Sequence, residues 1–226
     1  MNKRCFYTEL AYAIGLLILS LGTALMERAD FGVSMVVAPA YILHLKLSQH
    51  LPFFSFGMAE YTLQAALLLL TMLIVRRAKL SYLFSLVTAV IYGLLLDGAM
   101  ALLALLPDGY LALNAGLYVV GMLLCSAGIS LLFHTYISPE AYEMFVREVS
   151  QHFHLDIHKF KTAYDCASCL ISILMSFIFF GLWHFEGIKF GTVLCALLNG
   201  FLISQFTKLF ERKFEFKDRF SLKKYF

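Results

Sequence analysis

The sequence predicts an all-α integral membrane protein in which six transmembrane helices form two inverted three-helix repeats. Each repeat is expected to carry a short interfacial or re-entrant helix after its first span. Apolar residues make up 61% of the chain and charged residues 15%, whereas soluble domains have about 45–50% and about 25%. Six stretches reach the roughly 20 apolar residues that cross a bilayer. The small and polar residues that interrupt the first half recur in the same order in the second.

The six expected spans are bounded by polar or proline-containing segments, and all four prolines fall between them, where a helix break is tolerated. The first apolar run is longer than a signal-peptide core and five spans follow it, so we interpret it as a span. The expected spans are 7–27, 57–75, 80–105, 110–133, 162–184 and 189–208. The expected units are residues 1–106 as the first repeat, 107–210 as the second, and 211–226 as a basic cytoplasmic tail.

The distribution of lysine and arginine predicts the orientation, because these residues are retained on the cytoplasmic side beside short loops. With the N-terminus inside, only Arg28, Lys46 and Lys189 of the 18 cations face outward. We therefore predict a multi-pass protein of the bacterial cytoplasmic (inner) membrane with both termini cytoplasmic. The basic tail is expected to contact anionic lipid headgroups of the bilayer, and no nucleic-acid partner is predicted.

Matching residues in the two halves are separated by 96 to 107 positions, a drift that small loop insertions absorb. Because each unit has an odd number of spans, the second must enter the membrane from the opposite face. Duplication without function, or chance among small residues, is the alternative explanation. The matched pairs are Gly32 with Gly128, Ser34 with Ser130, Phe56 with Phe160, Ala59 with Ala163, Ser85 with Thr192, and Gly93 with Gly200.

A short segment follows the first span of each unit. Residues 33–47 are mostly apolar, and residues 138–153 show the apolar spacing of an amphipathic helix, with Ser138 and Pro139 as expected cap and first helical position. Either segment could lie along the lipid headgroups. Either could instead form a re-entrant helix whose N-terminal amides face a site between the repeats. Both interpretations stay open for both segments.

Three acidic residues fall within the expected spans, where a charge is costly and is usually kept for a pathway, a pair or a ligand. Glu60 and Asp165 take nearly equivalent places about one turn into their spans, and Asp97 lies deeper. They could carry a proton or cation, or hold a cationic substrate. The alternative is that they cap helix N-termini.

Neutral polar residues could complete a substrate- or ion-binding site, although ordinary interhelical hydrogen bonds explain such residues equally well. A charged run at the outer end of the first span is either a paired cap or a gate. The candidate binding residues are Glu60, Gln64, Asp97, Asp165, Asn199 and Ser34, and the candidate gate residues are Glu27, Arg28 and Asp30. The glycines expected at close helix crossings are Gly15, Gly22, Gly93, Gly116, Gly121 and Gly200.

Cysteine and histidine do not indicate a metal or redox centre. Cys166 and Cys169 form one C-x-x-C pair inside an apolar helix, and small packing cysteines explain it. His154 and His158 have the i, i+4 spacing of some zinc ligands, but a solvated cluster with His152 is the simpler interpretation. No nucleotide-binding glycine loop, G-x-S-x-G or H-E-x-x-H motif occurs. We expect no metal, no cofactor and no enzymatic activity.

Several segments together resemble the bacterial YczE/YitT-like membrane proteins. They are the turn Ala29 to Ser34, the Phe56-Gly57 entry, Gly93 with Asp97, Lys161 to Asp165, and Gly191-Thr192. The family's turn has the form Ala-x-Leu-Gly-x-Ser-Pro; here Phe31 replaces the leucine and Met35 the proline. The resemblance implies a bacterial inner-membrane protein and says little about biochemistry.

These observations predict a secondary transporter of a small molecule or ion, with its site between inverted repeats. The alternative is a substrate-binding (capture) subunit, or a regulatory membrane partner, that transports nothing by itself. A homo-oligomer is compatible with either function. Neither the solute nor the coupling ion follows from the sequence.

Overall fold

The computed structural model describes residues 4–105, 110–138, 140–181 and 188–218. Within these residues all the helices except α2 and α6 are long and apolar enough to cross a membrane. The protein is therefore a multi-pass membrane protein whose outer surface contacts lipid. In chain order the elements are β1 (Arg4–Tyr7), α1 (Thr8–Arg28), α2 (Ala38–Leu47), α3 (Phe56–Val75), α4 (Leu80–Leu103), α5 (Leu111–Phe133), α6 (Ala141–His152), α7 (Ile157–Phe180), α8 (Phe190–Lys213) and β2 (Phe214–Lys217).

Each of the six predicted spans coincides with one long helix, and the differences lie at the helix ends. Helix α7 begins five residues before the predicted position 162 because Asp156 caps it, accepting a hydrogen bond of 2.9 Å from the backbone N–H of Lys159. Helix α8 continues five residues past position 208. Polar residues extend both helices beyond the apolar stretch, since a helix need not end where the hydrocarbon does. Residues 182–184 of the predicted fifth span lie outside the described residues.

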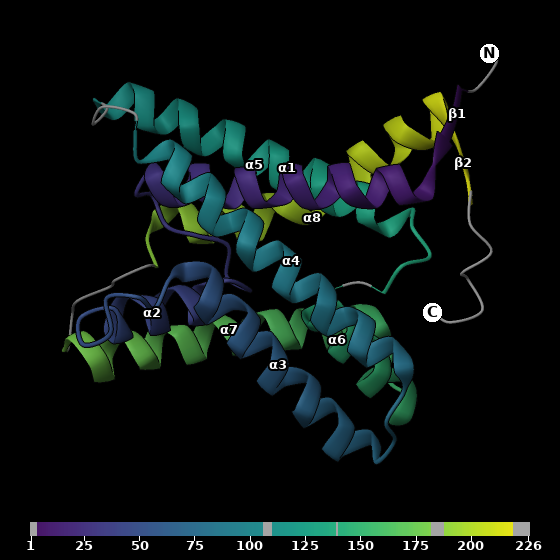
Figure 1. The fold of residues 1–226 in the computed structure, drawn as a ribbon, viewed down its shortest axis with the longest axis horizontal. Coiled ribbons are helices and arrows are strands. Elements are labelled where there is room, and N and C mark those ends of the chain that lie inside the picture. The colour runs from purple at the N-terminus through teal and green to yellow at the C-terminus, as the bar shows by residue number, and fades with distance from the viewer. Residues whose placement is uncertain (1–3, 106–109, 139, 182–187, 219–226) are drawn as a thin grey trace.

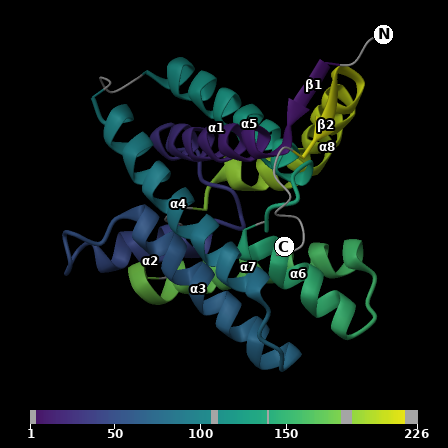
Figure 2. The ribbon, with the colours of Figure 1, turned by 45° about the vertical axis from the view of Figure 1, so that its right-hand side comes forward.

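The helices lie in two groups joined by α4 (Figures 1 and 2). In the first group, α5 packs along α1 on one side and against α8 on the other. In the second group, α2 packs on α3 and α7, and α6 also packs on α3 and α7. Helix α4 crosses between the groups and contacts α1, α3 and α6. Each short helix of the second group thus lies between two long ones.

Helices α1 and α5 cross at glycines, as predicted. A Cβ on Gly121 would lie 2.7 Å from the carbonyl oxygen of Gly22, and a Cβ on Gly22 would lie 2.8 Å from that of Gly121. Further along the crossing, a Cβ on Gly128 would lie 2.8 Å from the carbonyl oxygen of Gly15. The two backbones therefore touch over about two helical turns.

Some of the predicted glycine roles are wrong. A Cβ on Gly116 or Gly200 would meet nothing within 4 Å, so neither supports a close crossing. The pairing of Gly32 with Gly128 is also wrong, because Gly32 lies in the turn after α1 with a φ of 101° whereas Gly128 lies inside α5. Small residues permit close approach without requiring it, and only the packing decides which of them are used.

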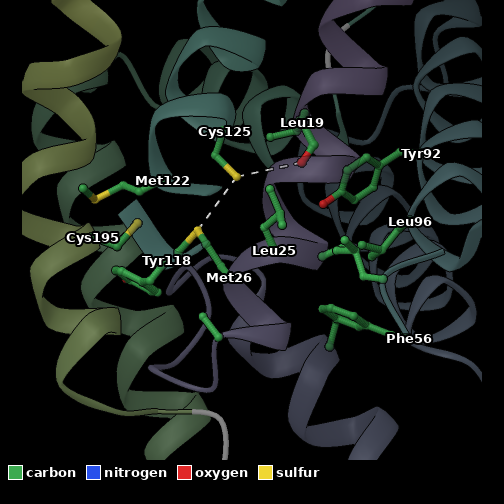
Figure 3. Packing of buried hydrophobic residues seen from close by; sticks show 14 of the residues in the cluster. Leu19, Leu25, Met26, Phe56, Tyr92, Leu96, Tyr118, Met122, Cys125 and Cys195 are labelled. Carbon is green, nitrogen blue, oxygen red and sulfur yellow. Dashed lines mark hydrogen bonds between the residues drawn. The ribbon is translucent and has the colours of Figure 1, made fainter. Parts of the chain in front are cut away.

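The buried core links the two groups (Figure 3). The thiol of Cys125 on α5 lies 3.8 Å from the carbonyl oxygen of Leu19 on α1 and 3.9 Å from the sulfur of Met26. The hydroxyl of Thr23 on α1 lies 3.7 Å from the same thiol and 2.9 Å from the hydroxyl of Tyr92 on α4. These contacts fix α4 against α1, and so fix the position from which α4 meets α3.

A two-stranded parallel sheet corrects the all-α prediction. Strand β1 pairs with β2, with Arg4 opposite Phe214, and the rings of Phe6 and Phe214 are 5.2 Å apart. The sequence Phe-Glu-Phe-Lys of β2 has the alternation of a strand, but four residues are too short to be told from a polar tail. The beginning of the predicted tail is thus helix and strand, and residues 219–226 lie outside the described residues.

Candidate functional site

A buried carboxyl group marks the candidate site. Glu60 of α3 has no solvent-exposed surface. Its Oε2 accepts hydrogen bonds from the hydroxyl of Tyr142 on α6, at 2.9 Å, and from the side-chain amide of Gln64, at 3.2 Å. Its Oε1 is buried and has no hydrogen-bond partner. A buried oxygen left in this state is costly, so its position calls for a functional explanation.

The N-terminus of α6 lies against the same part of α3. The backbone N–H of Ala141 donates a hydrogen bond of 3.2 Å to the side-chain Oε1 of Gln64. Gln64 is the ninth of the 20 residues of α3, so the first turn of α6 lies beside the middle of that span. About two turns further along α6, Glu148 accepts hydrogen bonds of 2.5 Å from Lys79, the residue before α4, and of 3.0 Å from Tyr82 on α4.

Glu140, the residue before α6, adds a second acidic group. Its Oε1 is buried and has no hydrogen-bond partner. Burial first, and then the charges of Glu60 and Glu143, raise the pKa of Glu140 to about 8 against the opposing effect of Lys161. Burial and the nearby charge of Glu60 also raise the pKa of Tyr142 well above its ordinary value, so its hydroxyl keeps its proton.

A charged triad borders these groups on α7. Lys161 donates a hydrogen bond of 2.6 Å to Glu143 of α6, and its Nζ lies 3.5 Å from Oδ1 of Asp165. Asp165 is the ninth residue of α7, deeper in the helix than in the predicted apolar span, where it lies about one turn in. The helix begins earlier than the apolar stretch, and Asp165 therefore lies about two turns in. One cation thus serves two acids here.

The segment before α2 contacts the middle of α7, much as the first turn of α6 contacts the middle of α3. The hydroxyl of Ser168 donates a hydrogen bond of 3.2 Å to the carbonyl oxygen of Met35, three residues before α2. Ser168 is the twelfth of the 24 residues of α7, close to its middle. At the far end of α2, Lys46 donates a hydrogen bond of 3.2 Å to the carbonyl oxygen of Phe179 near the end of α7.

Two of the predicted binding residues, Asp97 and Asn199, form hydrogen bonds within the protein away from Glu60. Asp97 caps α3, because its two carboxylate oxygens accept hydrogen bonds from the hydroxyl of Ser55, at 2.5 Å, and from the backbone N–H of Gly57, at 2.7 Å. Asn199 of α8 accepts a hydrogen bond of 2.9 Å from Ser126 of α5. Both arrangements match the structural alternatives stated for these residues.

Ser34 shapes the start of α2. Its carbonyl oxygen accepts hydrogen bonds of 3.0 Å from the backbone N–H of Val37 and 2.9 Å from that of Ala38. Its side chain lies beside Cys195 of α8. Ser138, before α6, is not the predicted cap: α6 starts after Glu140, and the carbonyl oxygen of Ser138 accepts a hydrogen bond from Thr88. Pro139 lies outside the described residues.

The candidate gate residues lie apart from Glu60, at the end of α1. Glu27 accepts a hydrogen bond of 3.3 Å from the hydroxyl of Tyr41 on α2. Asp30 accepts one of 2.6 Å from Lys189, the residue that precedes α8. Arg28 occupies the last turn of α1. These contacts tie α1 to α2 and α8 at one end of the molecule.

The candidate metal and redox residues form no centre among the described residues. No group of three His, Cys, Asp or Glu side chains in the described part of the chain could hold a metal ion. Cys166 and Cys169 are free thiols. The side chain of His158 lies outside what the structure describes.

Sequence reasoning missed Glu140 and Tyr142 as site residues. Glu140 follows a proline at the start of an amphipathic helix, a place where an acid ordinarily serves the helix dipole. Tyr142 lies on the apolar face of that helix, where a tyrosine ordinarily packs. The available signal was an acid directly before a helix start. It would indicate a buried site only if that helix start faced the protein interior, and the sequence does not determine the direction of α6.

With this geometry in view, comparison with known proteins assigns a family. A family model described as "Family of unknown function (DUF6198)" matches residues 6–208. The chain belongs to this family. The match contains no link to the YczE/YitT-like proteins, so that resemblance stays a prediction. No curated protein and no solved structure matches the chain.

Proposed function

We propose that the protein is a secondary transporter of a small polar solute, with its site between two inverted three-helix halves. The proposed site is the buried cluster of Glu60, Gln64, Glu140 and Tyr142, bordered by Lys161. The proposal places the protein in the bacterial cytoplasmic membrane with both termini inside, as the distribution of lysine and arginine indicates. It assigns no enzymatic activity.

The observation that carries the proposal is the position of the two short helices. The first turn of α6 touches the middle of α3 at Gln64, and the segment leading into α2 touches the middle of α7 at Ser168. From there the helices run to opposite ends of the molecule, where α6 meets Lys79 and α2 meets Phe179. This supports two re-entrant helices whose positive N-terminal ends meet near the middle of the membrane, as in many transporters.

The packing of the helices supports the inverted repeat. If α1 to α4 are exchanged with α5 to α8 in order, the pair α1 and α4 becomes α5 and α8, and the pair α3 and α6 becomes α7 and α2. All of these pairs are in contact. The described parts of α7 and α8 lack the extensive contact that α3 makes with α4, so the halves differ there.

The glycines at the crossing of α1 and α5 also support the inverted repeat, and they give a more consistent sequence separation between matching residues of the two halves. Gly121 follows Gly15 by 106 residues, and Gly128 follows Gly22 by the same 106. The rejected pairing of Gly32 with Gly128 had an offset of 96. An offset of 106 agrees with the values of 104 and 107 that the sequence predicts for the other matched residues, which supports a small drift between the halves.

A reconstitution experiment tests the proposal. Liposomes that contain the purified protein are loaded with a defined mixture of amino acids, nucleobases, vitamins and polyamines. Mass spectrometry then identifies the solutes that leave the liposomes. The variants are Tyr142→Phe and Tyr136→Phe, because each removes a tyrosine hydroxyl that donates to a glutamate, at Glu60 and Glu9 respectively. We expect a solute to leave with the wild type and with Tyr136→Phe, and to leave at least tenfold more slowly with Tyr142→Phe.

Two results would contradict the proposal. Flux that is equal in the two variants would mean that the path avoids the α6 site. A solute that raises the thermal midpoint of the protein but never leaves the liposomes would instead support the capture-subunit alternative.

A further inference from the structure

Two carboxyl oxygens at the site are buried and lack hydrogen-bond partners, Oε1 of Glu60 and Oε1 of Glu140. The two residues come from different elements, since Glu60 belongs to α3 and Glu140 immediately precedes α6. Both residues lie at the contact of α3 with the start of α6, since Ala141, next to Glu140, donates to Gln64, and Gln64 donates to Glu60. The charge of Glu60 also raises the pKa of Glu140. Two buried carboxylates in such a poorly solvated cluster cannot both stay ionised without compensation.

The nearest cation compensates for other acids. Lys161 pairs with Glu143 at 2.6 Å and with Asp165 at 3.5 Å. It lowers the pKa of Glu140, yet this effect is smaller than those of burial and of the neighbouring acids. One lysine thus interacts with three acidic groups, Glu140, Glu143 and Asp165. With these acids and Glu60 all ionised, the site would hold an excess of negative charge.

Most of the other titratable groups around the pair are neutral. The titratable and charged side chains that interact electrostatically with the two acids are Tyr12 on α1, Tyr92 on α4, Cys125 on α5, Tyr142 and Glu143 on α6, and Lys161 and Tyr164 on α7. The hydrogen bonds from Tyr142 and Gln64 both reach Oε2 of Glu60. These donors leave Oε1 of Glu60 without a partner, and Oε1 of Glu140 also has none.

A proton satisfies this arrangement better than a metal ion. A bound calcium or magnesium ion takes about six or more oxygen ligands in a closed shell, and the described residues contain no metal-holding group of three His, Cys, Asp or Glu side chains. A proton needs one carboxylate oxygen. Its binding converts a carboxylate to a carboxylic acid and lowers the negative charge of the pair by one, with water as the donor.

We propose that Glu60 and Glu140 share one exchangeable proton, and that this proton is the ion whose movement is coupled to that of the solute. The first part stands on the burial of the two acids and on their unpartnered oxygens, and the coupling part rests on the proposed transporter function. Because Glu60 also holds Tyr142, uptake of the proton alters the contact between α3 and the first turn of α6. Proton binding and the position of the re-entrant helix are thereby linked.

Infrared spectroscopy of purified protein in detergent tests the proton site without requiring transport. The carbonyl stretch of a protonated carboxylic acid is followed from about pH 6 to about pH 10 in the wild type, Glu60→Gln, Glu140→Gln and Glu211→Gln. Glu211 is the matched control, since its carboxylate is 60% exposed near the end of α8. We expect a band of about one carboxyl group that disappears as the pH rises through about 8.

The variants decide the assignment. The band should be lost or displaced along the pH axis in both Glu60→Gln and Glu140→Gln, and kept in Glu211→Gln. Because either glutamine variant could fold poorly, size-exclusion chromatography and the Glu60→Asp variant, which keeps a carboxyl group, accompany them. No protonated carboxyl band in the wild type at about pH 6, or a band unchanged in both site variants, would overturn the proposal.

The flux assay separates this inference from the proposed function. A titrating band together with no flux of any solute would leave the proton site standing and remove the transporter. Flux that ignores a pH gradient, or the absence of the band in a protein that transports, would remove the coupled proton and leave the transporter standing.

Discussion

The crossing of α1 and α5 predicts a large difference between two glycine substitutions five residues apart on one helix. A Cβ on Gly121 would lie 2.7 Å from the backbone carbonyl oxygen of Gly22, and ordinary contact begins at 3.4 Å. The helices must therefore separate by about 0.7 Å, the difference between these two distances. Such overpacking costs about 1–3 kcal/mol. On Gly116 the same Cβ meets nothing within 4 Å, and alanine should stabilise the helix by about 0.5–1 kcal/mol.

Thermal unfolding in detergent, followed by the helical circular dichroism signal, measures the difference. One kcal/mol corresponds to about 2–4 °C in a chain of this size. We expect Gly121→Ala to lower the midpoint by several degrees and Gly116→Ala to leave it unchanged or raise it slightly. Equal midpoints for the two variants, or a lower midpoint for Gly116→Ala, would refute the close crossing and with it the offset of 106 residues that supports the inverted repeat.

Three further predictions concern Glu140, Gly32 and Lys189, which lie just outside the helices. Between its ordinary pKa of 4.5 and the raised pKa of about 8, Glu140 binds more protons in the folded than in the unfolded protein. The free energy of unfolding therefore falls as pH rises through this window, by at most about 1.4 kcal/mol per pH unit. Glu140→Gln should flatten this slope in thermal melts, and an unchanged slope would contradict the assignment. Gly32→Ala should lower the midpoint by the equivalent of at least about 1 kcal/mol, because φ is 101° and a Cβ would collide with Thr192; a wild-type midpoint would show that the turn is misplaced. Lys189→Met removes the ion pair with Asp30 and should change the free energy of unfolding by less than about 1 kcal/mol, because Asp30 is mostly exposed. A larger loss would show that this pair stabilises the fold more than an exposed ion pair does.

Part of the site could be predicted from the sequence, and the rest depended on the direction of α6. Glu60 stood out because an acid inside an apolar span is costly wherever its partners lie. Glu140 did not, because an acid before a helix is ordinary until that helix is known to start beside the middle of another span. Asp97 shows the opposite case, since an acid deep in a predicted span proved to be the cap of the neighbouring helix.

The number, length and approximate ends of the membrane helices follow from composition alone, since each span is a local property of about 20 consecutive residues. The relation between the halves was visible in the sequence only as a loose repeat, and an incorrect glycine pairing was built into it. Which glycines lie at a crossing, which acids meet, and where α2 and α6 point were decided by the tertiary structure. These features depend on contacts between residues far apart in the chain, and many sequences with the same apolar pattern would pack differently.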